Sequence, residues 1–256
     1  MTPTGTSEKI RQKQVLLYGP GAQELGVEVS AHPGLTIVES SPDVLICYGG
    51  DGTLLAAEAE WPGIPKVPVL NSRIGHHCIH EDIHEVIARL ARGELVANKY
   101  NKLRCAIHRK GHPEPRHIIT PLNEISVQKQ RTNSAVRFQL WIDDEEYEHG
   151  LEIVGDGFIV CTPFGSTSYF SKITRGAFIC GMGIAFCASD QRTNHIVVPP
   201  KTLIRLRITR GPAVLAHDSS QEYVELTGGD ELVVQEHPDG ATILTCAPAR
   251  RFDKPF

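Results

Sequence analysis

The spacing of apolar residues changes near residue 98, and this change constrains the fold more than any other feature of the chain. Before it, apolar runs of strand length occur at 14–18, 35–38, 43–48 and 66–70. They alternate with helix-forming stretches, of which Ile83–Arg92 has apolar residues at helical spacing and stops at Gly93. Strands that alternate with helices predict a parallel sheet with covered faces. We therefore expect residues 1–98 to form an α/β domain.

After residue 98, apolar and polar residues largely alternate, which is typical of half-buried strands. The clearest such runs are 102–107, 136–142 and 203–208. Two further runs, Tyr223–Leu226 and Glu231–Val234, flank a Gly-Gly-Asp turn and predict a β-hairpin. The pattern predicts an antiparallel, β-sandwich-like second domain over residues 99–239.

The run Ile46–Thr53, Ile-Cys-Tyr-Gly-Gly-Asp-Gly-Thr, ends a strand abruptly in glycines just before a helix-forming stretch. Glycine lets a backbone turn sharply and approach a ligand, and a helix N-terminus favours phosphate. A carboxylate repels phosphate, so Asp51 is interpreted as a base or as a partner for metal or sugar hydroxyls. An ordinary strand-end turn with an unrelated acid is the alternative.

A second motif, Asp156–Tyr169, runs from a strand into Thr-Pro-Phe-Gly and then into hydroxyl residues. Ser166, Thr167 and Ser168 would offer short donors and acceptors beside backbone N–H groups, which suits ribose hydroxyls or phosphate. Tyr169 could add a flat face for a base. A serine-rich helix cap is the alternative.

A third motif places an amide beside a carboxylate, at Asn123 and Glu124, between apolar residues. Such a pair can fix a sugar diol or a carboxamide by hydrogen bonds. A surface hairpin explains this short motif about as well.

Taken in order, the three motifs resemble the NAD kinase family. Its pattern includes a GGDGT turn, an asparagine-led loop after the next strand, L-N-[ED], and D-G-x-x-V-x-T-P-x-G-S-T-x-Y. The resemblance extends roughly from Val15 to Val234. GGDGT is shared with lipid kinases, and the T-P-x-G-S-T segment at Thr162–Thr167 distinguishes the families.

The resemblance implies an N-terminal α/β nucleotide domain, a β-rich NAD-binding domain, and a C-terminal tail, about 240–256, that returns to the first domain. It implies transfer of a phosphoryl group from ATP or polyphosphate to the 2′-hydroxyl of the adenosine ribose of NAD, giving NADP, with Mg²⁺ or another divalent cation. Asp51 would be the catalytic base. The implied nucleotide-binding residues are Gly49, Gly50, Gly52, Thr53, Asn71, Asn123, Glu124, Thr162, Ser166, Thr167, Ser168, Tyr169 and Gln221.

The sequence departs from the family pattern after Asn71, at Phe164, over 170–176, and at Asp218–Gln221, where the usual Asp-Gly-Gln is longer. Three cations, Arg73, Lys172 and Arg175, fall in or beside these segments. We expect one or more of them to contact phosphate; solvated or salt-bridged surface cations are the alternative.

A cluster of possible metal ligands, His76, His77, Cys78, His80 and His84, lies within nine residues. This spacing could bind zinc. However, the sequence supplies no second cluster, so polar residues at a helix start are the favoured interpretation and no metal ligands are assigned.

The resemblance implies small-molecule nucleotides as partners, and the bulk properties of the chain give no reason to expect nucleic acid or a membrane. A net charge of −4 gives no reason to expect nucleic acid. Residues 1–14 lack a signal-peptide core, and the longest apolar stretch, Ala177–Ala188, is too short to span a bilayer. Seven cysteines without a CxxC pair indicate reduced thiols in the cytoplasm, with Cys47, Cys161, Cys180 and Cys187 expected to be buried in apolar runs.

Family resemblance further suggests a homo-oligomer, a dimer or tetramer. Two alternatives to an NAD kinase stay open at this point. One is a non-catalytic NAD(P)-binding regulatory homologue, and the other is a related kinase with another acceptor, such as a lipid.

Overall fold

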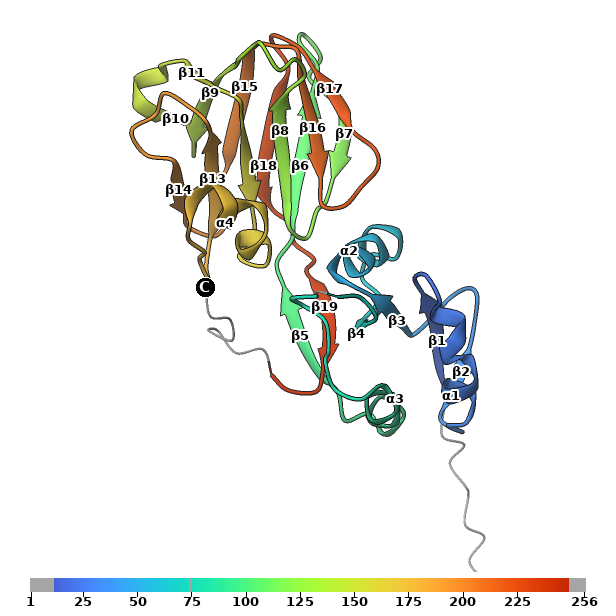
Figure 1. Cartoon of the computed structure of the whole chain (residues 1–256). Coiled ribbons are helices and arrows are strands. Elements are labelled where there is room, and N and C mark those ends of the chain that lie inside the picture. Colours follow the sequence, from blue (N-terminus) through green and yellow to red (C-terminus); the bar gives the residue numbers. More distant parts are fainter. Residues whose placement is uncertain (1–11, 74, 249–256) are drawn as a thin grey trace, which may run out of the picture. The chain divides into compact units, whose positions relative to one another are not determined.

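The computed structural model describes residues 12–73 and 75–248, and the chain divides into two compact units (Figure 1). Of the described residues, the first unit comprises 12–73, 75–98 and 242–248, and the second comprises 99–241. Residues 1–11, most of the stretch inspected for a signal peptide, lie outside the described residues, as does the expected tail beyond residue 248. The two units are described in turn.

The first unit is built on a six-stranded sheet in the order β2-β1-β3-β4-β19-β5. The register is parallel between β1 and β2, β1 and β3, β3 and β4, and β4 and β19, as the alternating pattern predicted. The strands are β1 (Lys13–Tyr18), β2 (Leu35–Ile37), β3 (Val44–Gly49), β4 (Lys66–Leu70), β5 (Val96–Tyr100) and β19 (Ala241–Thr245). The helices are η1 (Ala22–Leu25), α1 (Gly26–Ser30), α2 (Asp51–Glu60) and α3 (Ile83–Arg92).

Helix α3 shows how directly the local sequence sets an element. The carboxylate of Asp82 caps its N-terminus by accepting the N–H groups of His84 and Glu85 at 2.9 and 3.3 Å. Its apolar face is buried, and Gly93 ends the helix in a left-handed conformation with φ of 71°. The helix spans the residues that the spacing predicted.

Helix α2 is tied to the sheet by a buried ion pair. The ammonium group of Lys66, on β4, contacts the carboxylate of Glu58 and donates a hydrogen bond to the Trp61 carbonyl at 2.6 Å. Lys66 is 0% exposed and Glu58 is 2% exposed, so removing either partner would leave a charge in an apolar environment.

The second unit consists of two antiparallel sheets, as the period-two pattern predicted. One has seven strands, with order β10-β9-β15-β18-β6-β7 and β11 paired with β9, and the other has six, with order β14-β13-β12-β8-β16-β17. The first sheet contains β6 (Leu103–His108), β7 (Pro115–Ile119), β9 (Val136–Ile142), β10 (Glu145–Glu146), β11 (Ile153–Gly155), β15 (Ile204–Arg210) and β18 (Glu231–Glu236).

The second sheet contains β8 (Glu124–Lys129), β12 (Gly157–Cys161), β13 (Met182–Cys187), β14 (His195–Val198), β16 (Ala213–His217) and β17 (Val224–Leu226). The unit also has the short helices η2 (Tyr147–Gly150), η3 (Gly165–Thr167) and α4 (Tyr169–Thr174). Phe170 of helix α4 packs in a small apolar cluster with residues of β12 and β13, among them Ile159.

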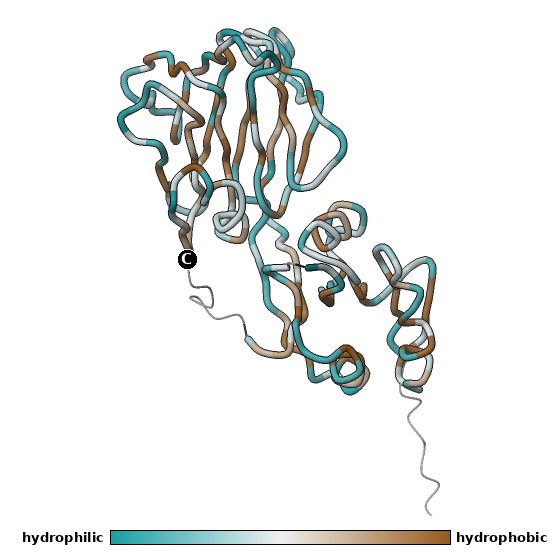
Figure 2. Tube along the Cα trace, viewed as in Figure 1, coloured by the Kyte–Doolittle hydropathy of each residue, from teal (hydrophilic) through white to brown (hydrophobic). Residues whose placement is uncertain are grey.

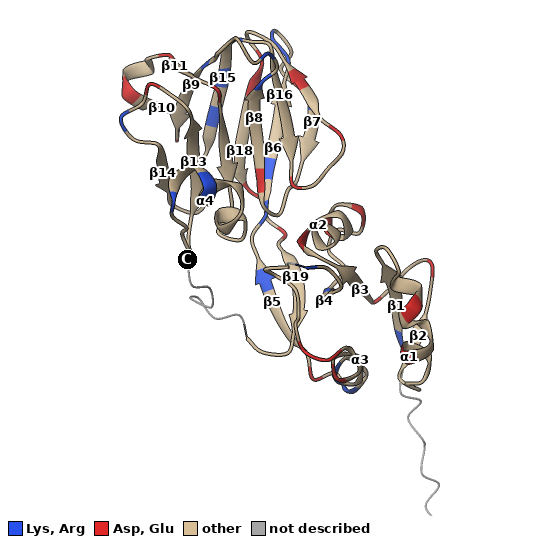
Figure 3. Ribbon diagram, viewed as in Figure 1, with Lys and Arg blue, Asp and Glu red and all other residues tan. Residues whose placement is uncertain are grey.

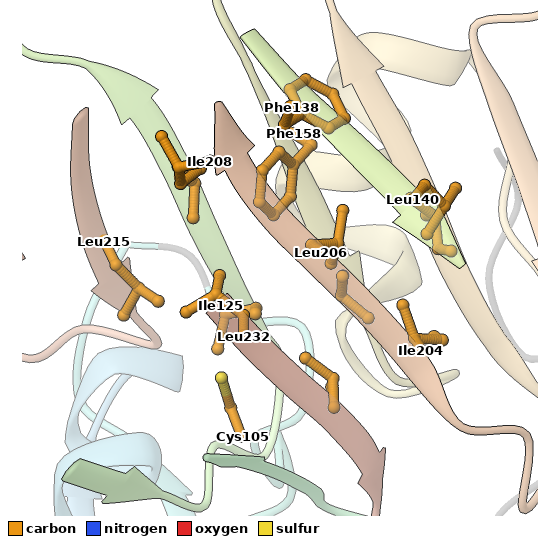
Figure 4. Packing of buried hydrophobic residues seen from close by; sticks show 14 of the residues in the cluster. Cys105, Ile125, Phe138, Leu140, Phe158, Ile204, Leu206, Ile208, Leu215 and Leu232 are labelled. Atoms are coloured by element: carbon orange, nitrogen blue, oxygen red, sulfur yellow. The ribbon is translucent and has the colours of Figure 1, made fainter. Parts of the chain in front are cut away.

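Alternate residues from both sheets form one continuous core in this unit (Figure 4). Phe138 on β9 and Phe158 on β12 lie with ring centroids 4.6 Å apart, and both are fully buried. Hydrophobic and hydrophilic residues alternate along its strands, as Figure 2 shows. Figure 3 shows basic and acidic residues interspersed over the same unit. The expected fold class, α/β plus an antiparallel β-domain, is confirmed.

The predicted hairpin across Gly228 and Gly229 is wrong. Strand β17 pairs with β16 in the six-stranded sheet, whereas β18 pairs with β6 and β15 in the seven-stranded sheet. Between the two strands, Asp230 is 2% exposed, and its carboxylate accepts hydrogen bonds from Arg109 and from the Lys110 N–H group. The glycine turn therefore carries the chain from one sheet to the other.

The cysteines among the described residues are free thiols. Cys47, Cys161 and Cys187 are buried as expected, but Cys180 is exposed, because it lies in the turn before β13 rather than within the strand. Across the described ranges, no helix has both the length and the apolar character needed to cross a bilayer.

Candidate functional site

In the first unit, the glycine turn connects the end of β3 to the start of α2, as the sequence predicted. A Cβ atom on Gly49 would lie 2.8 Å from Thr53 Cβ, so the contact between these residues requires glycine. Gly50 is the extended N-cap residue of α2, and Thr53 donates its N–H to the Gly50 carbonyl at 3.0 Å. Gly52 is exposed in the first turn of the helix.

Asp51 is the first residue of α2, and its carboxylate binds the loop that follows β4. One carboxylate oxygen accepts the His76 N–H at 2.8 Å and the other accepts the His77 N–H at 2.8 Å. The Cys78 thiol lies 3.7 Å from the second oxygen. A carboxylate offers about four acceptor positions, two on each oxygen, so the oxygen bound by His76 keeps one. Asp51 therefore both anchors this loop and retains capacity for a ligand.

The loop that begins at Asn71 is closed at both of its ends. The Asn71 N–H donates to the Gly49 carbonyl at 2.9 Å, and the Ile79 N–H donates to the Pro68 carbonyl at 2.7 Å. The side chains of Asn71 and Arg73 are exposed. Asn71, Arg73 and Asp51 thus share one edge of the sheet, at the carboxyl ends of β3 and β4.

The histidine cluster does not assemble into one metal-binding group. His80 lies before α3 and contacts the Gly75 carbonyl through a ring nitrogen at 3.1 Å. His84, on α3, pairs with Glu28 at 2.9 Å. Across residues 12–73 and 75–248, the structure has no grouping of three or more His, Cys, Asp or Glu side chains placed to hold a metal.

In the second unit, the Leu-Asn-Glu and Thr-Pro-Phe-Gly motifs are in direct contact. Thr162 donates its hydroxyl to the Leu122 carbonyl at 2.6 Å and its N–H to the Asn123 carbonyl at 2.9 Å. A Cβ atom on Gly165 would lie 2.7 Å from Asn123 Cα. Glycine is therefore required where these two segments meet. Phe164, at a position where the family usually has a small hydroxyl residue, is buried with its ring edge-on to Tyr100 at 4.9 Å.

Asp218, at the end of β16, holds the start of β8 in place. Its carboxylate accepts the N–H groups of Leu122 and Asn123 at 2.8 Å each and that of Glu124 at 3.2 Å. Burial raises the pKa of Asp218 above its usual range, although these N–H donors oppose the shift. In the sequence, Asp218 stood out only as part of a segment that differs from the family's Asp-Gly-Gln pattern. Its role as an anchor was not predicted.

Asn123 and Glu124 are the most unusual polar residues of this segment. They are 6% and 8% exposed, yet Asn123 Oδ1 and Glu124 Oε2 have no hydrogen-bond partner among the described residues. Burial, and then the neighbouring carboxylate of Asp218, raise the pKa of Glu124 to about 8. Buried polar atoms without partners are costly, so these two are suited to a ligand that supplies the missing hydrogen bonds.

The hydroxyl residues after Gly165 separate into internal and available groups. Ser166 is 1% exposed, and its hydroxyl donates to the Pro163 carbonyl at 2.7 Å, so it closes the turn. Thr167 and Ser168 are half-buried, and the Tyr169 ring is 41% exposed at the start of α4. The available groups therefore flank α4 on its N-terminal side.

The remaining predicted residues of this unit lie on its surface. Lys172 is exposed on α4, and Arg175, also exposed, ends that helix with φ of 61°. Gln221 is exposed in the turn after β16. The structure thus brings together Asn123, Glu124, Thr162 and Gly165.

Comparison with known proteins gives consistent matches. Residues 122–245 match the family described as the ATP-NAD kinase C-terminal domain. An NAD kinase of Clostridium botulinum is 27% identical over 216 residues, covering 80% of this chain and 74% of that protein. An NAD kinase of Gemmatimonas aurantiaca is 28% identical over 238 residues, covering 88% and 80%.

Solved structures show the same fold at low sequence identity. The yeast NADH kinase complexed with NADH aligns with a TM-score of 0.80 and 16% identity, covering 96% of this chain and 86% of that one. An NAD kinase from Archaeoglobus fulgidus in complex with ATP aligns with a TM-score of 0.71 and 19% identity, covering 94% and 95%.

Proposed function

The chain belongs to the NAD kinase family, and from this membership we propose that it phosphorylates the 2′-hydroxyl of the adenosine ribose of NAD to give NADP. The observation that carries the proposal is the pair of unpartnered atoms, Asn123 Oδ1 and Glu124 Oε2, beside the family's Thr-Pro-x-Gly-Ser-Thr segment. A nucleoside offers hydroxyl and amide groups that match these atoms. A lipid acceptor would need an extended apolar groove, which this hydroxyl-rich segment does not provide.

The proposed reaction divides its tasks between side chains. Asp51 takes the proton of the 2′-hydroxyl, whose oxygen then forms a bond to the terminal phosphorus of ATP or polyphosphate while the bridging oxygen leaves with ADP or the shortened chain. A general base of this kind contributes about 10² to 10⁴ in rate. Asn123, Glu124 and Tyr169 hold the nucleoside, and Gly49, Gly50 and Gly52 let the backbone at the start of α2 approach phosphate.

A divalent cation fits the chemistry of the residues present. Mg²⁺ is usually held by one or two carboxylates together with substrate phosphates rather than by a cage of protein ligands. The Asp51 carboxylate oxygen that binds His76 keeps a further acceptor position, which suits a cation that arrives with the nucleotide. When bound, such a cation neutralises charge on the transferred phosphoryl group.

The proposal is tested by measuring NADP formation with wild type and Asp51→Asn. Because a base is lost, we expect turnover to fall by at least about a hundredfold while NAD still binds. The Asp51 carboxylate also anchors His76 and His77, so Cys78→Ala serves as a control for disturbance of the loop and should keep most activity. Equal turnover of wild type and Asp51→Asn would remove Asp51 from the mechanism.

The same assay separates the alternatives. A non-catalytic NAD(P)-binding homologue would be stabilised by nucleotide without forming NADP. Four further points stay predictions. They are the choice between ATP and polyphosphate, a homo-oligomeric state, a cytoplasmic location, and phosphate contacts of Arg73, Lys172 and Arg175.

A further inference from the structure

The second unit has a hollow outside the segments discussed so far. It has a volume of about 540 Å³ and lies over the β6–β7 turn, the start of β18 and the outward face of β15. Ligand pockets usually measure about 300–1,000 Å³, so the hollow has room for a metabolite. Its lining residues are His108, Arg109, Lys110, Gly111, His112, Pro113, Arg207, Gly229, Glu231 and Val233. None of the predicted nucleotide-binding residues is among them.

Two of the lining residues, Arg109 and Lys110, are bound by a buried carboxylate outside the lining. Asp230 is 2% exposed and accepts hydrogen bonds from Arg109 at 2.5 Å, from the Lys110 N–H at 3.2 Å and from the Thr227 N–H at 2.9 Å. Burial opposes its ionisation, but the hydrogen bonds from Thr227 and Arg109 outweigh this and hold the pKa of Asp230 below its usual range. Two turns from separate parts of the chain are thereby fixed against each other.

Not all of the cations that line the hollow are held in ion pairs with acids. Arg109 is bound to Asp230, and Arg207 is bound to Glu231 at 3.0 Å while lying over the Trp141 ring. These two ion pairs leave Lys110 as the cation in excess, because Glu231 is the sole acid in the lining. Lys110 is exposed, and its aliphatic stem packs on Gly229, where a Cβ atom would lie 2.6 Å from Lys110 Cδ.

Two histidines add hydrogen-bond capacity beside Lys110. His108 Nδ1 lies 3.0 Å from the Pro113 carbonyl, and a carbonyl only accepts, so Nδ1 carries a proton and Nε2 is left for other contacts. His112 is exposed in the same turn, and its N–H binds the Arg109 carbonyl at 2.9 Å. A lysine with neighbouring imidazoles on a fixed turn suits a phosphate group.

We propose that this hollow is a second ligand site, for a phosphorylated small molecule between a sugar phosphate and a mononucleotide in size, with Lys110, His108 and His112 around the phosphate. The inference does not depend on the proposed function, because its residues and its fold contacts are separate from those of the nucleotide segments.

The test uses the full chain and ribose 5-phosphate as the probe, followed through the ring signals of His108 and His112 in ¹H–¹³C spectra. The signals are assigned with His108→Gln and His112→Gln. We expect saturable shifts with ribose 5-phosphate, and none with ribose or with sodium chloride at matched ionic strength. Shifts that are equal with all three solutes, or absent, would overturn the proposal.

Charge reversal then tests the lysine. Lys110→Glu should weaken binding of ribose 5-phosphate by at least about tenfold, since a charge-assisted contact becomes repulsive. Lys201→Glu, which reverses the same charge in the exposed turn before β15, should change the affinity by less than about twofold. Equal losses in both variants would mean a general charge effect and would sink the proposal. Shifts confined to Tyr169 would place the probe at the nucleotide segments instead and leave the proposed function standing.

Discussion

The carboxylate of Asp218 accepts the N–H group of Asn123 at 2.8 Å and thereby fixes the first residues of β8 against the end of β16. Backbone groups, rather than a cation, are the recorded hydrogen-bond partners of this carboxylate. The position of the Asn123 and Glu124 side chains thus depends on an acid that is distant in sequence. Four predictions concern this anchor and the other buried contacts.

Asp218→Asn should lower the free energy of unfolding by about 1–3 kcal/mol, because the new amide NH₂ group would face backbone N–H donors that lose an acceptor. It should also weaken NAD binding, since Asn123 is displaced. Urea unfolding and NAD titration measure the two effects. Asp239→Asn, in an exposed turn, is the matched control and should leave both unchanged.

Glu124 should make the chain less stable as pH rises. Its folded-state pKa, about 8, lies above the ordinary value of 4.5, so the folded state holds a proton that the unfolded chain releases across this interval. The free energy of unfolding should then fall by up to about 1.4 kcal/mol per pH unit between these two pKa values. The stability that protonated Glu124 allows should be fully present only below the lower value.

Urea unfolding of wild type and Glu124→Gln at pH 5, 6.5 and 8 measures this slope. The variant cannot ionise, so its stability should fall less steeply with pH than that of the wild type. Parallel curves would show that Glu124 does not titrate in this range.

Lys66→Met should cost about 3–5 kcal/mol of stability, because Glu58 would remain buried without its ammonium partner. Replacing both residues, as Lys66→Met with Glu58→Met, should recover most of the loss. Thermal or urea unfolding of the two variants measures the recovery. The exposed pair of Glu85 and Arg89 offers a contrast, and Arg89→Met should have little effect. A double variant as unstable as Lys66→Met would contradict the role of the ion pair.

Gly165→Ala should disturb nucleotide binding and stability together. Its new methyl group would lie 2.6 Å from the Asn123 carbonyl carbon, and backbone cannot yield as a flexible side chain can. We expect a loss of about 1–3 kcal/mol in unfolding free energy. Gly176→Ala is the control, since the nearest heavy atom to its added Cβ is 3.9 Å away. Nucleotide titration and unfolding curves for both variants decide the matter.

The sequence predicted what depends on local spacing. The bounds of α3 followed from Asp82, the apolar face and Gly93, and the parallel and antiparallel sheets followed from their periodicities. The hairpin failed because a glycine turn specifies a reversal and not a partner strand; the buried Asp230, bound to the distant Arg109, directs β18 to β6.

The same limit applies to the candidate site. The motifs identified Asn123, Glu124 and Thr162 as residues of interest, but their mutual contact, the clamp by Asp218 and the internal use of the Ser166 hydroxyl depend on pairings across long stretches of chain. Exposure of Cys180 was missed for a related reason, since an apolar run does not reveal where its strand begins.

Strand β19 lies between β4 and β5 in the six-stranded sheet, although about 140 residues separate it from β5 in the chain. During synthesis on the ribosome, the strands of both antiparallel sheets emerge before β19 does. The sheet of the α/β unit therefore lacks the strand between β4 and β5 until β19 has been synthesised. Its last folding step depends on β19 rather than on the first hundred residues of the chain.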